Sequence, residues 1–439
     1  MKYLATVIVC ILVAVGVSTG DADTLSLDVE EAVKIALQNN LNLKSERIDL
    51  GTRERAKDTA WNEYLPGLNV NAASSYVSEA ERFTGLFPNT DRWTISAGFS
   101  ADLDLTGAKR LGIRNALLEY EEGRISLETV ERQLTREVKK SFYYLILIQE
   151  GIRIIHETID TAQKRYDQAL INYENGLESE LTVMSTLVTL ENIRPELESA
   201  RVTYRTRALQ FKQLLGLEDE VTFDLQGAID FAAADFDTGS LIDTYSAENL
   251  SVQSLQKSIQ LLDNQKKLAR SEGFAPVLLV SSSLATSLRD PIQSNVASGA
   301  DWIDGFTFRV GLSLPLDGLF PSSRSRVSIQ DIEDGITRAN VQLMETMQRV
   351  AVDIETSVLN MDKSLRTMQS LQENVNLAQK VYDLTEIEYN AGVTDLLQLE
   401  DANDKLLDAK LAVLEEKYNY LAYFFDLEYV LNTSLTEGL

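Results

Sequence analysis

The chain contains two copies of one pattern. The segment from Ala162 to Asp167 (Ala-Gln-Lys-Arg-Tyr-Asp) recurs 216 residues later (378 − 162), from Ala378 to Asp383, with a single change. At the same spacing Ile171, Tyr173, Gly176, Leu181, Leu190, Tyr204 and Leu215 match Ile387, Tyr389, Gly392, Leu397, Leu406, Tyr420 and Leu431. Upstream the copies still correspond at a slightly different spacing, and Asn40-Leu41 parallels Asn249-Leu250. Self-similarity of this kind indicates a repeated structural unit. We therefore expect two structural repeats, 21–227 and 228–439, that follow a signal peptide at 1–20.

Each repeat is dominated by helix. In 107–174, apolar and tyrosine side chains alternate at spacings of three and four residues, from Leu145 to Tyr173, which is the pattern of a coiled-coil seam. The second repeat shows a similar seam within 323–391. Gly176 and Gly392 mark the turns that follow, and shorter helices are expected at 177–216 and 393–433. Pro195 is expected to kink the first of these.

Helix lengths suggest how these pieces pair. A helix of 68 residues is ~100 Å long, and each long helix has two shorter companions, one of which opens the repeat (28–63 and 238–273). We expect each repeat to be a coiled-coil hairpin with one continuous side and one side made of two stacked pieces. The fold class predicted is mostly α with a small β part, in which tandem long helical hairpins form an α-barrel.

The β part consists of four segments with alternating apolar and polar residues: 68–78, 94–105, 277–288 and 306–316. Their length suits tilted strands that cross a bilayer. The intervening loops, 79–92 and 289–304, and their borders hold aromatic residues that suit a membrane interface: Phe83, Phe87, Trp93 and Trp302. Phe274, which precedes the strand 277–288, suits the same place. Alternation alone also fits a soluble sheet with one wet face. Open strand edges are not tolerated in lipid, so four strands require partner copies. Two copies would supply eight strands and three would supply twelve.

The N-terminus and the composition exclude several classes of function. Lys2 precedes an apolar run from Leu4 to Val15 and then small residues, as in a secretory signal. Cys10 lies inside that run, a poor place for a lipid-attachment cysteine, so the mature chain lacks cysteine and has one histidine, His156. Disulfides and multi-histidine metal sites are thereby excluded. The net charge of −26 opposes nucleic-acid binding. No phosphate loop or nucleophile motif is present, so we expect neither an enzyme nor a cofactor.

A known family shares these features. The tract from Tyr389 to Ala402, its twin Tyr173-Glu-Asn-Gly176 and the opening phrase from Val29 to Asn40 resemble the TolC-like outer-membrane efflux proteins. The resemblance covers essentially the whole mature chain. It implies a homotrimer with a 12-stranded β-barrel in the outer membrane and a long periplasmic portion. It also implies a passive conduit that works with a periplasmic adaptor and an inner-membrane transporter, as in efflux or type I secretion.

The resemblance also assigns roles to residues. The turns with Tyr173, Gly176, Tyr389 and Gly392 would form the periplasmic tip that meets the adaptor. The constriction of the best-known member carries two aspartates three residues apart, and those positions here are Gln398 and Asp401. Because Gln398 departs from that pattern, Glu400 and Asp404 are added as candidates for the periplasmic aperture.

The sequence leaves three alternatives open. A secreted, soluble coiled-coil scaffold of the periplasm, with hairpins that only cap the helices, would explain the same periodicities. Within the channel reading, export of small molecules and secretion of proteins give the same sequence pattern. Solvent-exposed helix faces would equally account for Glu400 and Asp401.

Overall fold

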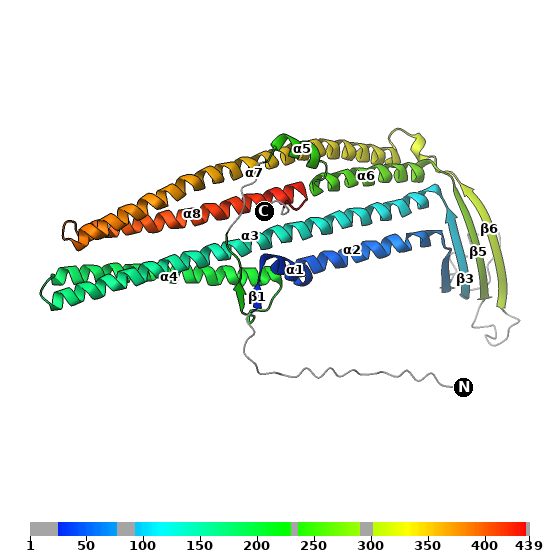
Figure 1. The fold of residues 1–439 in the computed structure, drawn as a ribbon. Helices are drawn as coiled ribbons and strands as arrows, with labels where there is room; N and C mark the ends of the chain where they lie inside the picture. Colours follow the sequence, from blue (N-terminus) through cyan, green and yellow to red (C-terminus); the bar gives the residue numbers. More distant parts are fainter. Residues whose placement is uncertain (1–24, 77–92, 230–235, 290–301, 436–439) are drawn as a thin grey trace. The chain divides into compact units, whose positions relative to one another are not determined.

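The computed structural model describes residues 25–76, 93–229, 236–289 and 302–435 (Figure 1). The described chain forms two compact units, each assembled from separated stretches of sequence. Among the described residues, unit 1 comprises 25–40, 137–229 and 366–421. Unit 2 comprises 41–76, 93–136, 236–289, 302–365 and 422–435. The predicted signal peptide at 1–20 and most of the two strand-connecting loops lie outside the described residues.

Unit 1 is built from two helical hairpins. One joins the C-terminal part of α3 (Gly107–Glu174) to α4 (Glu180–Leu215). The other joins the end of α7 (Arg324–Asn390) to α8 (Leu396–Leu431). Their turns lie at the same end of the unit (Figure 1). Its buried side chains include Phe142, Leu145, Leu190, Phe211, Leu215, Leu399 and Tyr420. The predicted long helices are thus present, and their bounds differ from the prediction by at most one residue.

Both shorter helices begin three residues later than predicted, and the reason lies in their caps. The side chain of Ser179 accepts a hydrogen bond from the N–H of Thr182, and Asp395 Oδ1 accepts one from the N–H of Gln398. Such capping fixes where a helix starts, because it satisfies N–H groups that have no partner within the helix. Pro195 lies inside α4, which stays helical across that residue, and the kink expected there stays a prediction.

A small sheet in unit 1 was not predicted. β1 (Leu25–Leu27) pairs in parallel with β4 (Phe223–Leu225). Leu27 is fully buried, and the ring of Phe223 packs edge-on against Phe211 at 5.7 Å. Strands of three residues are too short to show alternation, and each is defined by a partner about 200 residues away, so sequence periodicity could not reveal them.

Unit 2 carries the main sheet. Its strands are β2 (Gly67–Tyr76), β3 (Trp93–Leu105), β5 (Val277–Arg289) and β6 (Trp302–Ser313), in the order β2-β3-β5-β6. All neighbouring pairs are antiparallel. The β3–β5 pair joins the two repeats, with Ile95 opposite Leu288 and Leu105 opposite Leu278. The predicted strand segments are therefore one sheet, to which each repeat contributes a hairpin.

The last strand was predicted four residues too late at its start and three at its end. Trp302 to Gly305 already pair with Leu288 to Ala285, so the strand begins inside the predicted loop. The strand ends at Ser313, two residues before Pro315. Proline has no N–H to donate to a ladder, so the alternation that continues through Leu314 and Leu316 does not extend the pairing.

The helix that opens each repeat was predicted as one piece and is broken in both. Residues 28–63 form α1 (Val29–Asn39), α2 (Leu41–Thr59) and a 3-10 turn, η1 (Ala60–Tyr64). Residues 238–273 form α5 (Thr238–Tyr245) and α6 (Leu250–Phe274). The breaks coincide with Asn40 and Asn249, which the repeat alignment had matched.

Both asparagines donate a side-chain hydrogen bond to a backbone carbonyl. Asn40 Nδ2 donates to the carbonyl of Leu214 at 2.9 Å, and Asn249 Nδ2 donates to the carbonyl of Val430 at 2.8 Å. The two acceptors lie in the last turns of α4 and α8, where carbonyls lack partners within the helix. Each bond therefore ties the start of a repeat to the end of the same repeat.

Among the described residues, no helix combines the length and apolarity needed to cross a membrane.

Candidate functional site

The turns at Gly176 and Gly392 share one backbone geometry. Both glycines have positive φ, 72° and 73°. Gly176 N–H donates to the carbonyl of Tyr173 at 2.9 Å, and Leu177 N–H donates to Asn172 at 2.8 Å. Gly392 and Val393 repeat this pattern with Tyr389 and Glu388, at 2.9 Å each. These are Schellman motifs, which need a residue that tolerates left-handed geometry. A side chain at either glycine would meet nothing within 4 Å, so backbone conformation alone demands glycine here.

Apolar side chains project from both turns into solvent. Leu177 and its repeat partner Val393 are 75% and 76% exposed, and Leu181 and its partner Leu397 are 75% and 72% exposed. The two turns thus present the same pair of exposed apolar side chains at matched positions of the repeats. The two tyrosines of the turns differ from each other in exposure. Tyr173 is exposed, whereas Tyr389 is half-buried, and its burial together with the carboxylate of Glu178 raises its pKa.

Three of the four predicted aperture residues lie on exposed positions of α8. Gln398 sits in the first turn, where its Oε1 accepts a hydrogen bond from Thr394 at 2.7 Å. Asp401 forms an ion pair with Lys405 at 2.5 Å. Asp404 is one turn further, and partial burial together with the charges of Asp408 and Asp401 raises the pKa of its carboxyl. Because residues three and four apart share a helix face, Asp401, Asp404 and Asp408 form one acidic stripe.

Glu400 is separated from that stripe. Its carboxylate accepts a hydrogen bond from the hydroxyl of Thr189, which lies on α4 of the other hairpin. Glu400 is half-buried, and its neighbour Leu399 is fully buried. The fourth predicted aperture residue therefore links the two hairpins of unit 1 rather than lining an open face.

A second and stronger link between the hairpins was missed by sequence reasoning. Arg165 on α3 donates to the hydroxyl of Tyr382 on α7, and this hydroxyl donates to Glu386 Oε1 at 3.2 Å. The guanidinium of Arg165 also lies 3.7 Å from Glu386, and only 16% of the arginine side chain is exposed. Burial, as the largest cause, raises the pKa of Tyr382, which stays a neutral phenol that can both accept and donate. We call Arg165, Tyr382 and Glu386 the latch.

A signal for the latch exists in the sequence. The repeated segments 162–167 and 378–383 differ at one position, where the first has Arg165 and the second has Val381. Shared positions keep a structural role: Gln163 bonds Asp167 at 2.9 Å, and Gln379 bonds Asp383 at 2.8 Å. The single position that differs supplies the arginine of the latch, Arg165.

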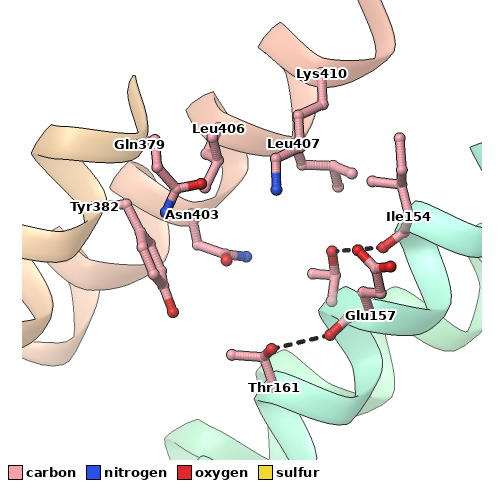
Figure 2. A pocket seen from close by; sticks show the side chains of 10 residues that line it. Ile154, Glu157, Thr161, Gln379, Tyr382, Asn403, Leu406, Leu407 and Lys410 are labelled. Carbon is pink, nitrogen blue, oxygen red and sulfur yellow. Dashed lines mark hydrogen bonds between the residues drawn. The ribbon is translucent and has the colours of Figure 1, made fainter. Parts of the chain in front are cut away.

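A polar cavity of 150 Å³ lies beside the latch, between α3 and the α7/α8 hairpin. Figure 2 shows Tyr382 from α7, Asn403 and Lys410 from α8, and Glu157 and Thr161 from α3 around this space. Such a volume holds several water molecules. Polar links between the hairpins thus lie beside a polar cavity in this part of unit 1.

Comparisons with known proteins agree with this arrangement. The model of the Outer membrane efflux protein family matches residues 32–217 and 241–433. The chain belongs to this family. The two matched stretches fall within the predicted repeats 21–227 and 228–439. Members of this family are outer-membrane efflux channels, so the protein is a TolC-family channel of the outer membrane with a periplasmic part, and it is not an enzyme.

Individual relatives are distant in sequence and close in fold. The chain is 22% identical to the outer membrane protein TolC of Salmonella enteritidis, over 96% of this chain and 85% of the relative. It is 21% identical to the pyoverdine export outer membrane protein OpmQ of Pseudomonas aeruginosa, over 88% and 81%.

Solved structures show the same likeness. The outer membrane channel CmeC of Campylobacter jejuni superposes with a TM-score of 0.77 at 16% identity, covering 92% of this chain and 85% of that one. The outer membrane protein VceC of Vibrio cholerae superposes with a TM-score of 0.74 at 15% identity, covering 92% and 96%. Family membership thus favours the channel over the secreted scaffold that periodicity alone had left open.

Proposed function

We propose that this TolC-family chain is one subunit of a homotrimeric conduit that exports substrates together with a periplasmic adaptor and an inner-membrane transporter. The edge strands β2 and β6 have no outer neighbour among the described residues, and one chain leaves both unpaired. Because open edges are not tolerated in lipid, copies must pair β6 of one with β2 of the next. Three copies supply twelve strands.

The helices of unit 1 also present faces that need a partner. Met184 and Val188 form an exposed apolar stripe on α4. Between α7 and α8 lies a shallow groove of 470 Å³ whose lining includes the small residues Ala378, Ala402 and Ala409. A stripe of large side chains and a groove of small ones on one unit complement each other between neighbouring copies.

The latch is the observation that supports gating at the tip. Each hairpin is internally packed, whereas the two are joined by Arg165, Tyr382 and Glu386 and by the bond from Thr189 to Glu400. Breaking these polar links loosens the attachment of one hairpin to the other in this part of unit 1, while the rings of Tyr144 and Tyr418 still join the hairpins further from the turns. Asp401 and Asp404 of the acidic stripe then line the aperture, with Gln398 beside them. A narrow acidic ring favours cations over anions.

The turns at Gly176 and Gly392 are the proposed docking surface for the adaptor, with Tyr173 and Tyr389 next to them. The exposed side chains of Leu177, Leu181, Val393 and Leu397 supply its apolar contacts. Energy for export comes from the inner-membrane transporter, since the channel itself is a passive conduit. Small molecules and proteins both remain as exported substrates.

The experiment that tests the conduit is the native mass of the mature protein extracted from outer membranes, followed by conductance recording on the same particle. Three chains per particle, recovered only with detergent and conducting ions in a planar bilayer, are expected. A particle of any other stoichiometry would refute the twelve-strand closure. A trimer that does not conduct would refute the conduit while leaving the closure intact.

A further inference from the structure

A groove on α3 has no role in the mechanism proposed above. It has a volume of 730 Å³ and lies wholly within unit 1. Its floor is an apolar face of α3 that includes Leu147, Ile148 and Ile152, and its walls are α4 and α8. Ile148 and Ile152 belong to the predicted seam but are only half-buried, because the groove leaves them without a covering helix. We call it the α3 groove.

The two walls are equivalent positions of the two repeats. Pro195, Ser199 and Thr203 of α4 stand opposite Leu411, Glu415 and Asn419 of α8, and each pair is 216 residues apart (411 − 195). Gly151 leaves this part of the floor without a side chain. A Cβ atom at this position would lie 3.7 Å from the side chain of Leu411. The groove is therefore built into the repeat, while its chemistry differs between the walls: a carboxylate on α8 faces a hydroxyl on α4.

Its polar groups carry one sign of charge. Glu196 and Glu415 line it from opposite walls, and both are exposed. Within the described part of the chain, neither carboxylate forms an ion pair or a hydrogen bond. No lysine or arginine is among the residues that line the groove. The walls thus offer two uncompensated negative charges above an apolar floor.

One end of the groove is aromatic. The rings of Tyr144 and Tyr418 pack against each other with centroids 5.2 Å apart. Arg207, which does not line the groove, lies 5.2 Å from the centroid of Tyr144. This tyrosine pair therefore already attracts one cation, as the negative face of an aromatic ring does. An apolar floor, an aromatic end and two unpaired carboxylates are the features that bind a cation carried on an apolar body.

We propose that the α3 groove is a binding site for lipophilic organic cations. Its volume falls within the range of ~300–1,000 Å³ that small-molecule sites occupy. Binding of such a cation is a role beyond the passive conduit proposed above. The proposal concerns binding alone. The groove can therefore fail to bind the cation while the channel still conducts ions, and the channel can fail to conduct while the groove still binds the cation.

The test uses two probes of matched shape and opposite charge. Tetraphenylphosphonium and tetraphenylborate are measured by equilibrium dialysis against the purified full-length mature protein in a nonionic detergent, with protein-free detergent as reference. We expect saturable binding of tetraphenylphosphonium and at least tenfold weaker binding of tetraphenylborate. Equal binding of the two ions would show that apolar contact alone is at work and would overturn the proposal.

Variants locate the site. Glu415→Gln and Glu196→Gln are each expected to raise the Kd for tetraphenylphosphonium about fivefold, since a unit charge ~4 Å away in watery surroundings has an effect of that size. Glu373→Gln removes an exposed carboxylate of α7 outside the groove and should leave the Kd unchanged. If the three variants bind alike, the groove is not the site.

A second variant fills the groove. Gly151→Leu adds a side chain above the floor, raises helix propensity and is expected to abolish tetraphenylphosphonium binding with the native mass unchanged. Unaltered binding by this variant would refute the assignment. Loss of the trimer would show that the groove is covered by a neighbouring copy and would also refute it. Conductance recorded on the same preparations reports separately on the conduit.

Discussion

Replacement of Tyr382 by phenylalanine tests the latch with the smallest change available. The hydroxyl of Tyr382 accepts from Arg165 and donates to Glu386, while its ring stays in place in the variant. Both lost bonds involve a charged group, and such bonds contribute about 1.5–3 kcal/mol when well buried. Here 43% of the Glu386 side chain is exposed, and Arg165 can still approach it from its present 3.7 Å.

The free-energy preference for the closed tip over the open tip is therefore expected to fall by about 1–2 kcal/mol. This change corresponds to a factor of about 5–30 in the open-to-closed ratio. The assay is single-channel recording of the purified trimer in planar bilayers, with open probability as the readout. Arg165→Val, which installs the residue found at the repeat partner Val381, should give an effect at least as large. The double variant should add little to either single change, because both act on one link.

Tyr166→Phe is the matched control. Tyr166 is the repeat partner of Tyr382, is half-buried like it, and has no hydrogen-bond partner among the described residues. The substitution Tyr166→Phe removes the same phenolic oxygen from the equivalent position in α3, so the open probability should stay at the wild-type value. If Tyr382→Phe and Arg165→Val both leave the open probability unchanged, the latch does not hold the tip closed. The reasoning is also refuted if Tyr166→Phe opens the channel equally.

Three further outcomes are expected. Gly392→Val forces a β-branched residue into positive φ at a cost of about 1–2 kcal/mol, so adaptor capture should fall while trimer mass is kept; Gly392→Asn, which tolerates this geometry, should capture normally. Asn249→Ala should lower the unfolding free energy by about 1–2 kcal/mol and speed hydrogen exchange at the end of α8, and exchange confined to other segments would contradict the tie to Val430. Asp404 has a raised pKa in the folded chain, so its ionised form opposes folding above that pKa. Asp404→Asn should therefore raise the melting temperature at pH 7, with the gain vanishing as the pH falls through the raised pKa toward the ordinary carboxyl value near 3.8; a gain that persists in acid would refute this cause.

Much of the fold follows from local sequence pattern. The seam from Leu145 to Tyr173 predicts the C-terminal part of α3, because a helix places residues three and four apart on one face whatever lies around it. Gly176 and Gly392 mark the turns because the Schellman geometry demands positive φ within a few residues of chain. The repeat alignment also matched Asn40 with Asn249, although their shared task became visible only with the acceptors Leu214 and Val430.

Tertiary structure decided the rest, because it depends on residues that are distant in sequence. Glu400 belongs to the α4–α8 link rather than to the acidic stripe because Thr189 stands opposite it, and no spacing along α8 encodes that neighbour. The latch needs Arg165 and Tyr382, 217 residues apart, on facing helices. The α3 groove exists because two walls from different repeats stop short of covering Ile148 and Ile152. Periodicity says which residues share a face of a helix, whereas only the packing of the chain determines what that face meets.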